Sequence, residues 1–353
     1  MRLLIGWLGA AMTLSAAAPE FRMHEIATGL RGGYQLVAAD VNGDGKPDLI
    51  ALAQGLGELA WYENPKWERH VLARGLDQPI NVAVLRGAMV LAERFSSNPA
   101  RSEGRVHVLT PKADVREEWT RREIDRLSTS HRLRVMQLGK EQVVINAPLA
   151  AATAVPPEYR GAIPMVMYRA PEWKRELISD AEQGVMHGIF VKGDRLYTAS
   201  TLGIHEYRLA KGKWQRREIH KGHQGTWPKS GASDVAVGKR ITAAIEPWHG
   251  NIVALYEKGA RRVLDEKLSE GHTIEITDFD GDGREEILVG DRGAGGGVFW
   301  YEGPEWKRQV IDGAGMRASS CVVLDLNADG KADIACIRGA TANLRWYERG
   351  LTK

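Results

Sequence analysis

An acidic motif that occurs three times along the chain is the feature that most constrains its fold. Each copy places aspartate or asparagine at alternate positions of a glycine-containing loop, and apolar segments flank the loop on both sides. The copies span residues 40–48, 278–286 and 325–333. Self-similarity of this kind indicates a repeat architecture, in which each unit buries its apolar face only against its neighbours.

A Trp-Tyr-Glu ending follows each acidic motif, and weaker copies of this ending fill the middle of the chain. Seven endings lie between Tyr62 and Tyr347, about one every 47 residues. A Trp-x-Arg segment follows most of them, at Trp67, Trp119, Trp173, Trp214 and Trp306. Short alternating strands separate these markers, and four strands in about 45 residues are typical of a propeller blade. We therefore predict an all-β, seven-bladed β-propeller of four-stranded blades over residues 19–353, with a β-helix or an open sandwich array as the alternative.

The two ends of the chain are expected to complete one blade together. Residues 21–26 resemble the segment that follows each Trp-Tyr-Glu ending, and the last ending occupies residues 346–348. An N-terminal strand that pairs with this ending would close the ring with backbone hydrogen bonds and remove an exposed sheet edge.

Residues 1–18 have the pattern of a signal peptide. Arg2 precedes an apolar run, and small residues suited to cleavage follow it. An uncleaved N-terminal anchor is the alternative. No later segment approaches the roughly 20 apolar residues that a membrane-spanning helix needs. We expect a secreted or periplasmic protein that has no membrane span after cleavage.

The charge distribution argues against a nucleic-acid partner. The chain has 48 Lys and Arg against 45 Asp and Glu, without a long block of like charge. Its two cysteines, Cys321 and Cys336, could form a disulfide, because a hairpin that pairs Asp325 with Asp333 brings them close together on adjacent strands. Two buried thiols are the alternative.

The acidic motifs predict up to three Ca²⁺ sites, although Mg²⁺ is also possible. Oxygen ligands at alternate positions of a tight loop can point inward together, and Ca²⁺ takes six to eight of them. In each loop, the residue between the third and fourth side-chain ligands is expected to add its backbone carbonyl oxygen. These residues are Lys46, Arg284 and Lys331. The predicted side-chain ligands are Asp40, Asn42, Asp44 and Asp48; Asp278, Asp280, Asp282 and Glu286; and Asp325, Asn327, Asp329 and Asp333. An Asx-rich turn without metal is the alternative.

A second candidate site is expected on the propeller axis, where equivalent positions of successive blades converge. His131, His187 and His272 lie at or just before the innermost strand of their repeats. Glu246 (in Glu246-Pro247-Trp248-His249), Arg94 and Arg292 follow the next strand. Neutral imidazoles could bind Zn²⁺, or one could transfer a proton. Ordinary channel histidines bonded to water and backbone are the alternative.

The three acidic motifs resemble those of VCBS or FG-GAP-like repeat propellers. Gly271-His272, Asp291-Arg292-Gly293 and residues 343–348 further resemble the propeller domain of aldos-2-ulose dehydratase/isomerase. This resemblance implies dehydration of oxidised sugars such as anhydrofructose and bound divalent metals. It does not imply the isomerase step, which that family's additional domains would carry.

Two functions follow, and the sequence leaves both open. The first is a calcium-binding propeller that holds a carbohydrate or another small ligand at its central channel. The alternative is a lyase that dehydrates keto-sugars. In it, His187 or His272 would act as base or metal ligand, Glu246 as acid, and Arg94 or Arg292 would stabilise the anion. An adhesion platform ranks third, and the oligomeric state is not predicted.

Overall fold

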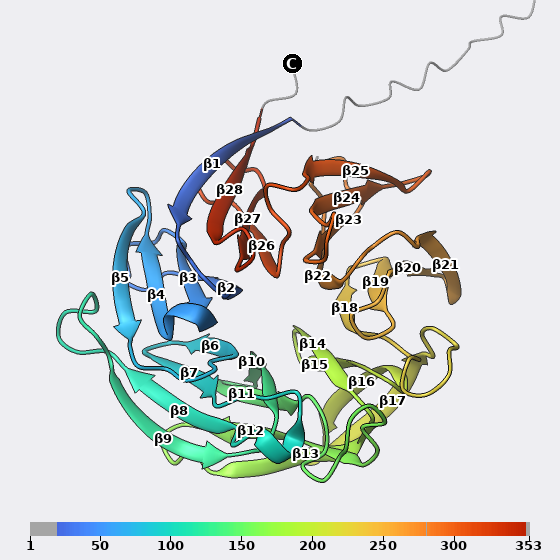
Figure 1. Ribbon diagram of the computed structural model, residues 1–353, viewed down its shortest axis with the longest axis horizontal. Helices are drawn as coiled ribbons and strands as arrows, with labels where there is room; N and C mark the ends of the chain where they lie inside the picture. The colour runs from blue at the N-terminus through green and yellow to red at the C-terminus, as the bar shows by residue number, and fades with distance from the viewer. Residues whose placement is uncertain (1–19, 280, 351–353) are drawn as a thin grey trace, which may run out of the picture.

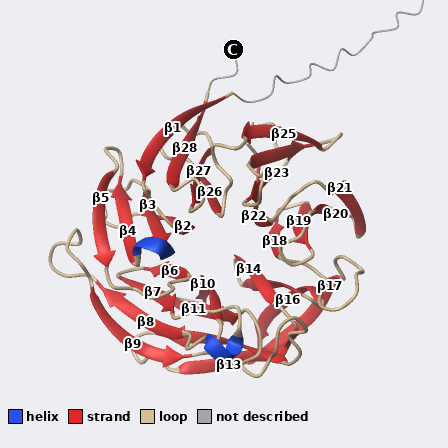
Figure 2. Ribbon diagram, viewed as in Figure 1, coloured by secondary structure: helices blue, strands red, loops and turns tan. Residues whose placement is uncertain are grey.

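Seven four-stranded antiparallel sheets surround a central axis in the computed structural model, which describes residues 20–279 and 281–350 (Figure 1). Apart from the strands, the described residues form only two short 3₁₀ helices, η1 (Gln54–Leu56) and η2 (Pro99–Arg101) (Figure 2). The predicted seven-bladed propeller is therefore confirmed. Within the described residues, no helix is long and apolar enough to cross a lipid bilayer.

Six blades follow the chain directly from the innermost to the outermost strand. Their strands are, blade by blade, β2 (Gly33–Ala39), β3 (Asp48–Ala53), β4 (Glu58–Glu63) and β5 (Glu68–Ala73); β6 (Asn81–Leu85), β7 (Ala88–Glu93), β8 (Arg105–Thr110) and β9 (Thr120–Arg126); β10 (Ser130–Leu138), β11 (Glu141–Pro148), β12 (Ala162–Arg169) and β13 (Arg175–Gln183); β14 (Met186–Lys192), β15 (Arg195–Ser200), β16 (Gly203–Ala210) and β17 (Lys213–His220); β18 (Asp234–Val237), β19 (Ile241–Glu246), β20 (Ile252–Glu257) and β21 (Ala260–Asp265); β22 (Gly271–Thr277), β23 (Glu286–Asp291), β24 (Val298–Glu302) and β25 (Lys307–Asp312).

The seventh blade joins the two ends of the chain. It contains β26 (Ser320–Leu324), β27 (Asp333–Arg338), β28 (Asn343–Arg349) and, as its outermost strand, β1 (Phe21–Thr28). β1 runs antiparallel to β28, with Phe21 opposite Arg349, and Figure 1 shows the blue strand beside the red one. The prediction that the N-terminal strand closes the ring is confirmed.

The core lies between neighbouring blades. The second strands are apolar on both faces, and all six residues of β3 are buried, because each blade is covered on both sides. Trp61 and Tyr62 of the first Trp-Tyr-Glu ending are almost completely buried. The Trp-Tyr endings therefore fill the space between blades, which explains why they recur with the blade period.

A buried or largely buried acid links a tyrosine and an arginine in five of the blades. At the contact between the third and fourth blades, the Tyr207 hydroxyl donates to the Glu182 carboxylate at 2.7 Å, and Arg216 Nε donates to it at 3.0 Å. The equivalent groups elsewhere are Tyr168–Asp125–Arg175, Tyr256–Glu246–Arg261, Tyr301–Asp265–Arg308 and Tyr347–Asp312–Arg345. We call these five groups the blade triads.

The blade triads account for both sequence markers. The tyrosine comes from the Trp-Tyr-like ending, and in three triads the arginine comes from the Trp-x-Arg segment, as Arg175, Arg216 and Arg308. In four triads the acid belongs to the preceding blade, so the ion pair fastens two blades together. The exception is Glu246, which lies in the same blade as Tyr256. There the preceding blade contributes His220, which stacks on Tyr256 with ring centroids 3.8 Å apart.

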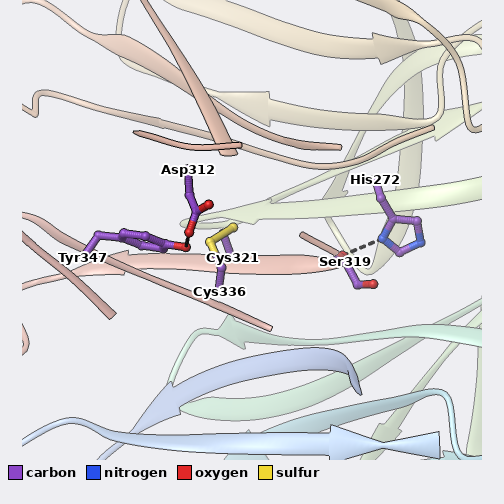
Figure 3. The surroundings of a disulfide bond; sticks show 6 residues. All are labelled: His272, Asp312, Ser319, Cys321, Cys336 and Tyr347. Carbon is purple, nitrogen blue, oxygen red and sulfur yellow. Dashed lines mark hydrogen bonds between the residues drawn. A yellow bond between two sulfur atoms is a disulfide. The ribbon is translucent and has the colours of Figure 1, made fainter. Parts of the chain in front are cut away.

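A disulfide joins Cys321 of β26 to Cys336 of β27 (Figure 3). The two residues lie directly opposite each other, and Leu324 rather than Asp325 pairs with Asp333. The expected register was therefore wrong by one residue, while the expected proximity of the cysteines was right.

Candidate functional site

Two cavities lie on the propeller axis and meet at Tyr34. The channel cavity, of about 570 Å³, is lined by the innermost strands β2, β6, β10, β14, β18, β22 and β26. The mouth cavity, of about 530 Å³, lies where several of these strands begin, and loops such as residues 95–97 and 248–249 form its wall. The residues between the two cavities therefore face both a loop-lined pocket and the central channel.

Four histidines gather at this boundary. The ring centroid of His187 lies 4.8 Å from that of His131, 4.7 Å from that of His249 and 5.0 Å from that of His272. Each of the three on innermost strands stands at the second residue of its strand, in β10, β14 and β22. Because those strands start at the same end of the ring, equivalent positions meet at the axis.

Three of these histidines, all in the described part of the chain, converge closely enough to hold a metal ion. Nitrogen atoms of His187, His249 and His272 all lie within 4.8 Å of one another. The Nε2 atoms of His187 and His249 are 3.1 Å apart. Two ligands of a tetrahedral zinc ion are about 3.3 Å apart, given Zn–N bonds of about 2.0–2.1 Å.

The partners of the other ring nitrogens are carbonyl and carboxylate oxygens. His272 Nδ1 lies 2.6 Å from the carbonyl oxygen of Ser319, which can only accept, so Nδ1 carries the proton (Figure 3). His187 Nδ1 lies 3.3 Å from the carbonyl oxygen of Ser233, and His249 Nδ1 lies 3.3 Å from Glu270 Oε1. With Nδ1 protonated, His187 and His272 each present an Nε2 lone pair, as metal-binding histidines do, and Arg132 Nη2 and the Tyr34 oxygen lie 3.3 Å from these two atoms.

Burial keeps these rings neutral. Burial is the main cause that lowers the pKa of His131, His187 and His272 well below the usual value, and the Arg132 guanidinium lowers it further. The pKa of His249 is also lowered, mainly by burial. A neutral imidazole can accept a proton or donate a lone pair to a metal at physiological pH.

Polar side chains surround the histidines. The Tyr34 oxygen lies 3.2 Å from His131 Nε2 and 3.3 Å from His272 Nε2, so it bridges two rings. Arg292 Nη2 donates to Glu270 Oε1 at 2.7 Å and lies 3.2 Å from His249 Nδ1. Hydrogen bonds from His249 and Arg292 lower the pKa of Glu270 to about 2, so this side chain is an anion.

The structure brings together four of the six predicted channel residues, namely His131, His187, His272 and Arg292. It places Glu246 elsewhere, because the Glu246 carboxylate is buried in a blade triad with Tyr256 and Arg261.

Arg94 also lies apart from the histidines. Its side chain points to the surface and pairs with Asp77 and Glu103. The expectation that Glu246 and Arg94 share a pocket with the histidines was therefore wrong.

Four further residues complete the site: His249, Tyr34, Glu270 and Arg132. His249 stands next to Trp248 in a segment that the sequence marked only for Glu246. A signal for it was available, since it follows the second strand of its blade, as Arg292 does. Tyr34, Glu270 and Arg132 carried no motif, and only the convergence of the blades reveals them.

The three acidic loops lie at the other end of the innermost strands, in the β2–β3, β22–β23 and β26–β27 connections. In the first loop, Asp40 accepts hydrogen bonds from the backbone of Gly43, Asp44 and Gly45, and Asp48 accepts from Val41. The second and third loops repeat this pattern through Asp278 with Glu286 and Asp325 with Asp333. Asp280 and residues 1–18 lie outside the described residues, and the calcium prediction stays a prediction.

Models of known protein families match three segments of the chain. An FG-GAP-like repeat model matches residues 278–336, and an FG-GAP repeat model matches residues 32–58. A model of the aldos-2-ulose dehydratase β-propeller domain matches residues 103–259, which include His131, His187 and His249.

One curated relative and one solved structure extend these matches. Aldos-2-ulose dehydratase of Phanerodontia chrysosporium is 24% identical over 271 residues, which cover 64% of this chain but only 29% of that protein. The solved structure of BBS1N in complex with ARL6DN superposes with a TM-score of 0.63 at 12% identity, and the match covers 95% of this chain and 98% of that one. The latter similarity reflects the fold alone. The chain is thus an FG-GAP-repeat propeller that is similar to the propeller domain of aldos-2-ulose dehydratase.

Proposed function

We propose that this chain is a metal-dependent carbon–oxygen lyase that dehydrates an oxidised sugar, an aldos-2-ulose or a related keto-sugar, in the mouth cavity. The observation that carries the proposal is the convergence of His187, His249 and His272 at a cavity of about 530 Å³. Likeness to the dehydratase propeller supports the choice of reaction.

The donor set suits zinc. All three donors are neutral imidazole nitrogens, and the opposite ring nitrogens are held by Ser233, Ser319 and Glu270, which is the outer arrangement typical of zinc ligands. A zinc ion bound there would act as a Lewis acid toward the sugar carbonyl.

The remaining side chains can supply the proton transfers. Elimination of water from a keto-sugar breaks a C–H bond beside the carbonyl and a C–O bond one carbon further on. His131 does not belong to the three converging ligands, and its neutral ring can accept the carbon-bound proton. Tyr34 can protonate the departing hydroxyl to give water, and Arg292 supplies positive charge beside the developing enolate.

Elemental mass spectrometry of the purified protein, combined with an assay of anhydrofructose dehydration, tests this proposal. We expect about one equivalent of zinc that the His249→Ala variant loses together with at least 100-fold of the turnover. His24→Ala is the matched control, because His24 lies on the outermost strand β1 and stacks on Trp346. Full turnover by zinc-free protein would overturn the proposal.

A sugar-binding propeller without catalysis is the second candidate, and the aromatic wall of the mouth cavity favours it. Phe95 and Trp248 line this cavity, and Tyr159 packs edge-on against Trp248 with centroids 5.5 Å apart. The C–H surface of a sugar ring stacks on the face of an aromatic side chain. Sugar binding that Trp248→Ala abolishes, without turnover in zinc-loaded protein, would favour this candidate over the lyase.

Calcium binding by the acidic loops and export by residues 1–18 are further parts of the proposal. Carboxylates at alternate loop positions support calcium binding. Arg2 and the apolar run that follows it support export. Up to three calcium equivalents per chain and a mature N-terminus near residue 19 are expected, and N-terminal sequencing of the exported protein checks the cleavage.

A further inference from the structure

The channel cavity contains charged side chains from only three of its seven strands. Arg132 and Arg134 come from β10, Asp234 from β18 and Glu275 from β22. The amides of Gln35 and Asn81 add polar groups, and most of the remaining wall is aliphatic. This cavity lies beyond the histidines, on the side away from the mouth.

Arg132 is buried without an anionic partner. Its side chain is 5% exposed, yet no carboxylate oxygen of the described residues lies within 4 Å of its guanidinium. Its polar neighbours are the neutral Tyr34 oxygen at 3.4 Å and His187 Nε2 at 3.3 Å. A buried charge ordinarily has an opposite charge beside it, because desolvation is otherwise too costly.

Arg134 extends the positive surface along the same wall. Residues two apart on a strand face the same side, about 7 Å from each other. Arg134 Nη1 donates to the Leu133 carbonyl at 2.9 Å and contacts Asn81 Oδ1 at 3.5 Å, and it has no carboxylate within ion-pair distance either. Two guanidinium groups therefore face the channel with unused donors.

Acceptors for hydroxyl groups also line the channel. Asp234 and Glu275 belong to other strands of the wall and interact electrostatically with Arg134 without forming an ion pair with it. Gly188 makes room for the Asp234 side chain, since a Cβ atom at residue 188 would lie 2.5 Å from Asp234 Oδ1. The cavity thus offers cations along one strand and hydroxyl acceptors on two others.

We propose that the channel cavity binds a sugar acid, with its carboxylate on Arg132 and Arg134 and its hydroxyls on Asp234 and Glu275. The cavity of about 570 Å³ has the size of a small-molecule site. A sugar acid matches both sets of groups, whereas a neutral sugar would leave the guanidinium groups unpaired and an inorganic anion would leave the carboxylates without donors. This site adjoins the mouth cavity at Tyr34, and binding there needs neither zinc nor turnover.

Calorimetric titration of the metal-free full chain with D-gluconate tests the proposal, because this acid has no carbonyl group to dehydrate. We expect binding in the micromolar to millimolar range, at least 10-fold weaker binding by sorbitol and by inorganic phosphate, and at least a 10-fold loss of gluconate affinity in Arg134→Met. Arg94→Met is the matched control, because Arg94 pairs on the surface outside both cavities.

Further variants distinguish a sugar-acid site from a general anion site and from the lyase proposal. Asp234→Asn should weaken gluconate but not phosphate, and circular dichroism verifies that each variant folds. His249→Ala should bind gluconate normally, so a failed lyase proposal would not affect this one. Equal affinity for phosphate and gluconate, or unchanged affinity in folded Arg134→Met, would overturn the sugar-acid site.

Discussion

Buried charge is treated in opposite ways between the blades and at the centre of the ring. In each blade triad, a buried or largely buried carboxylate receives hydrogen bonds from a tyrosine and an arginine. In the channel, the hydrogen-bond partners of buried Arg132 are the neutral Tyr34 oxygen and His187 Nε2, and Asp234 acts on it only from beyond ion-pair distance. Charge that is paired directly holds blades together, whereas charge without an ion-pair partner lines the cavity for which we propose a sugar-acid site.

The strongest test of this contrast is removal of a triad acid. Glu182 accepts hydrogen bonds from Ser200, Tyr207 and Arg216 and is 1% exposed. We expect Glu182→Gln to lower the free energy of unfolding by about 3–5 kcal/mol, because it weakens three hydrogen bonds to the buried carboxylate that are each worth about 1–1.5 kcal/mol. Urea denaturation at pH 7 measures this loss, and Glu141→Gln, on the surface, serves as control.

Glu182 also predicts how the stability of the protein falls at low pH. Burial alone would raise the pKa of Glu182, but nearby His205 and the hydrogen bonds from Ser200 and Arg216 outweigh it and lower the pKa to about 2. The stability that this group contributes is present above about pH 4.5 and is lost as the pH falls toward 2. If wild type and Glu182→Gln lose stability in parallel between pH 5 and 2, the triad does not stabilise the ring.

Two arginine substitutions sharpen the comparison directly. Arg216→Met should destabilise the protein by about 3 kcal/mol, because it strips a buried carboxylate of its cation. Arg132→Met should leave stability unchanged within about 1 kcal/mol or raise it, because it removes a buried charge that has no ion-pair partner. Equal losses in thermal and urea unfolding would mean that Arg132 is structural.

Glu275 provides a pH-dependent test inside the channel. Burial and nearby Asp234 raise the pKa of Glu275 to about 7, against the opposing effect of Arg134. The folded protein therefore binds this proton more tightly than the unfolded chain, and its contribution to stability is lost as the pH rises from about 4.5 through 7. Glu275→Gln should match wild type at pH 4.5 and be about 1–3 kcal/mol more stable at pH 8. A constant difference at both pH values would contradict this assignment.

Tyrosine hydroxyls should show the smallest difference. The Tyr301 hydroxyl donates to Asp265 at 2.7 Å. The Tyr34 oxygen lies farther from its partners at the channel, at 3.2 Å from His131 Nε2 and 3.4 Å from Arg132 Nη1. We expect Tyr301→Phe to cost about 1–2 kcal/mol and Tyr34→Phe less than about 0.5 kcal/mol. Chemical denaturation of both variants measures the difference, and the reverse order would argue against the structural role of the triads.

The repeat pattern of the sequence is enough to predict the architecture. Apolar strands and the seven Trp-Tyr-like endings recur with one period, and a repeat that cannot bury its face alone can only stack on its neighbours. The N-terminal strand was predictable for the same reason, since residues 21–26 carry the pattern of an outermost strand. The cysteine pair followed from hairpin geometry, because residues on adjacent strands of one hairpin lie close in sequence.

The roles of the buried polar residues, in contrast, depend on the assembled ring. His187, His249 and His272 come from different blades, and ring closure rather than spacing brings their nitrogens within 4.8 Å. Glu246 was predicted to act as an acid, but its role depends on Tyr256 and Arg261, which bind it from the neighbouring strands. The surroundings of Arg132 could not be predicted from the sequence either. Whether a carboxylate of the described residues lies beside its guanidinium depends on all the surrounding blades, and no local sequence pattern indicates it.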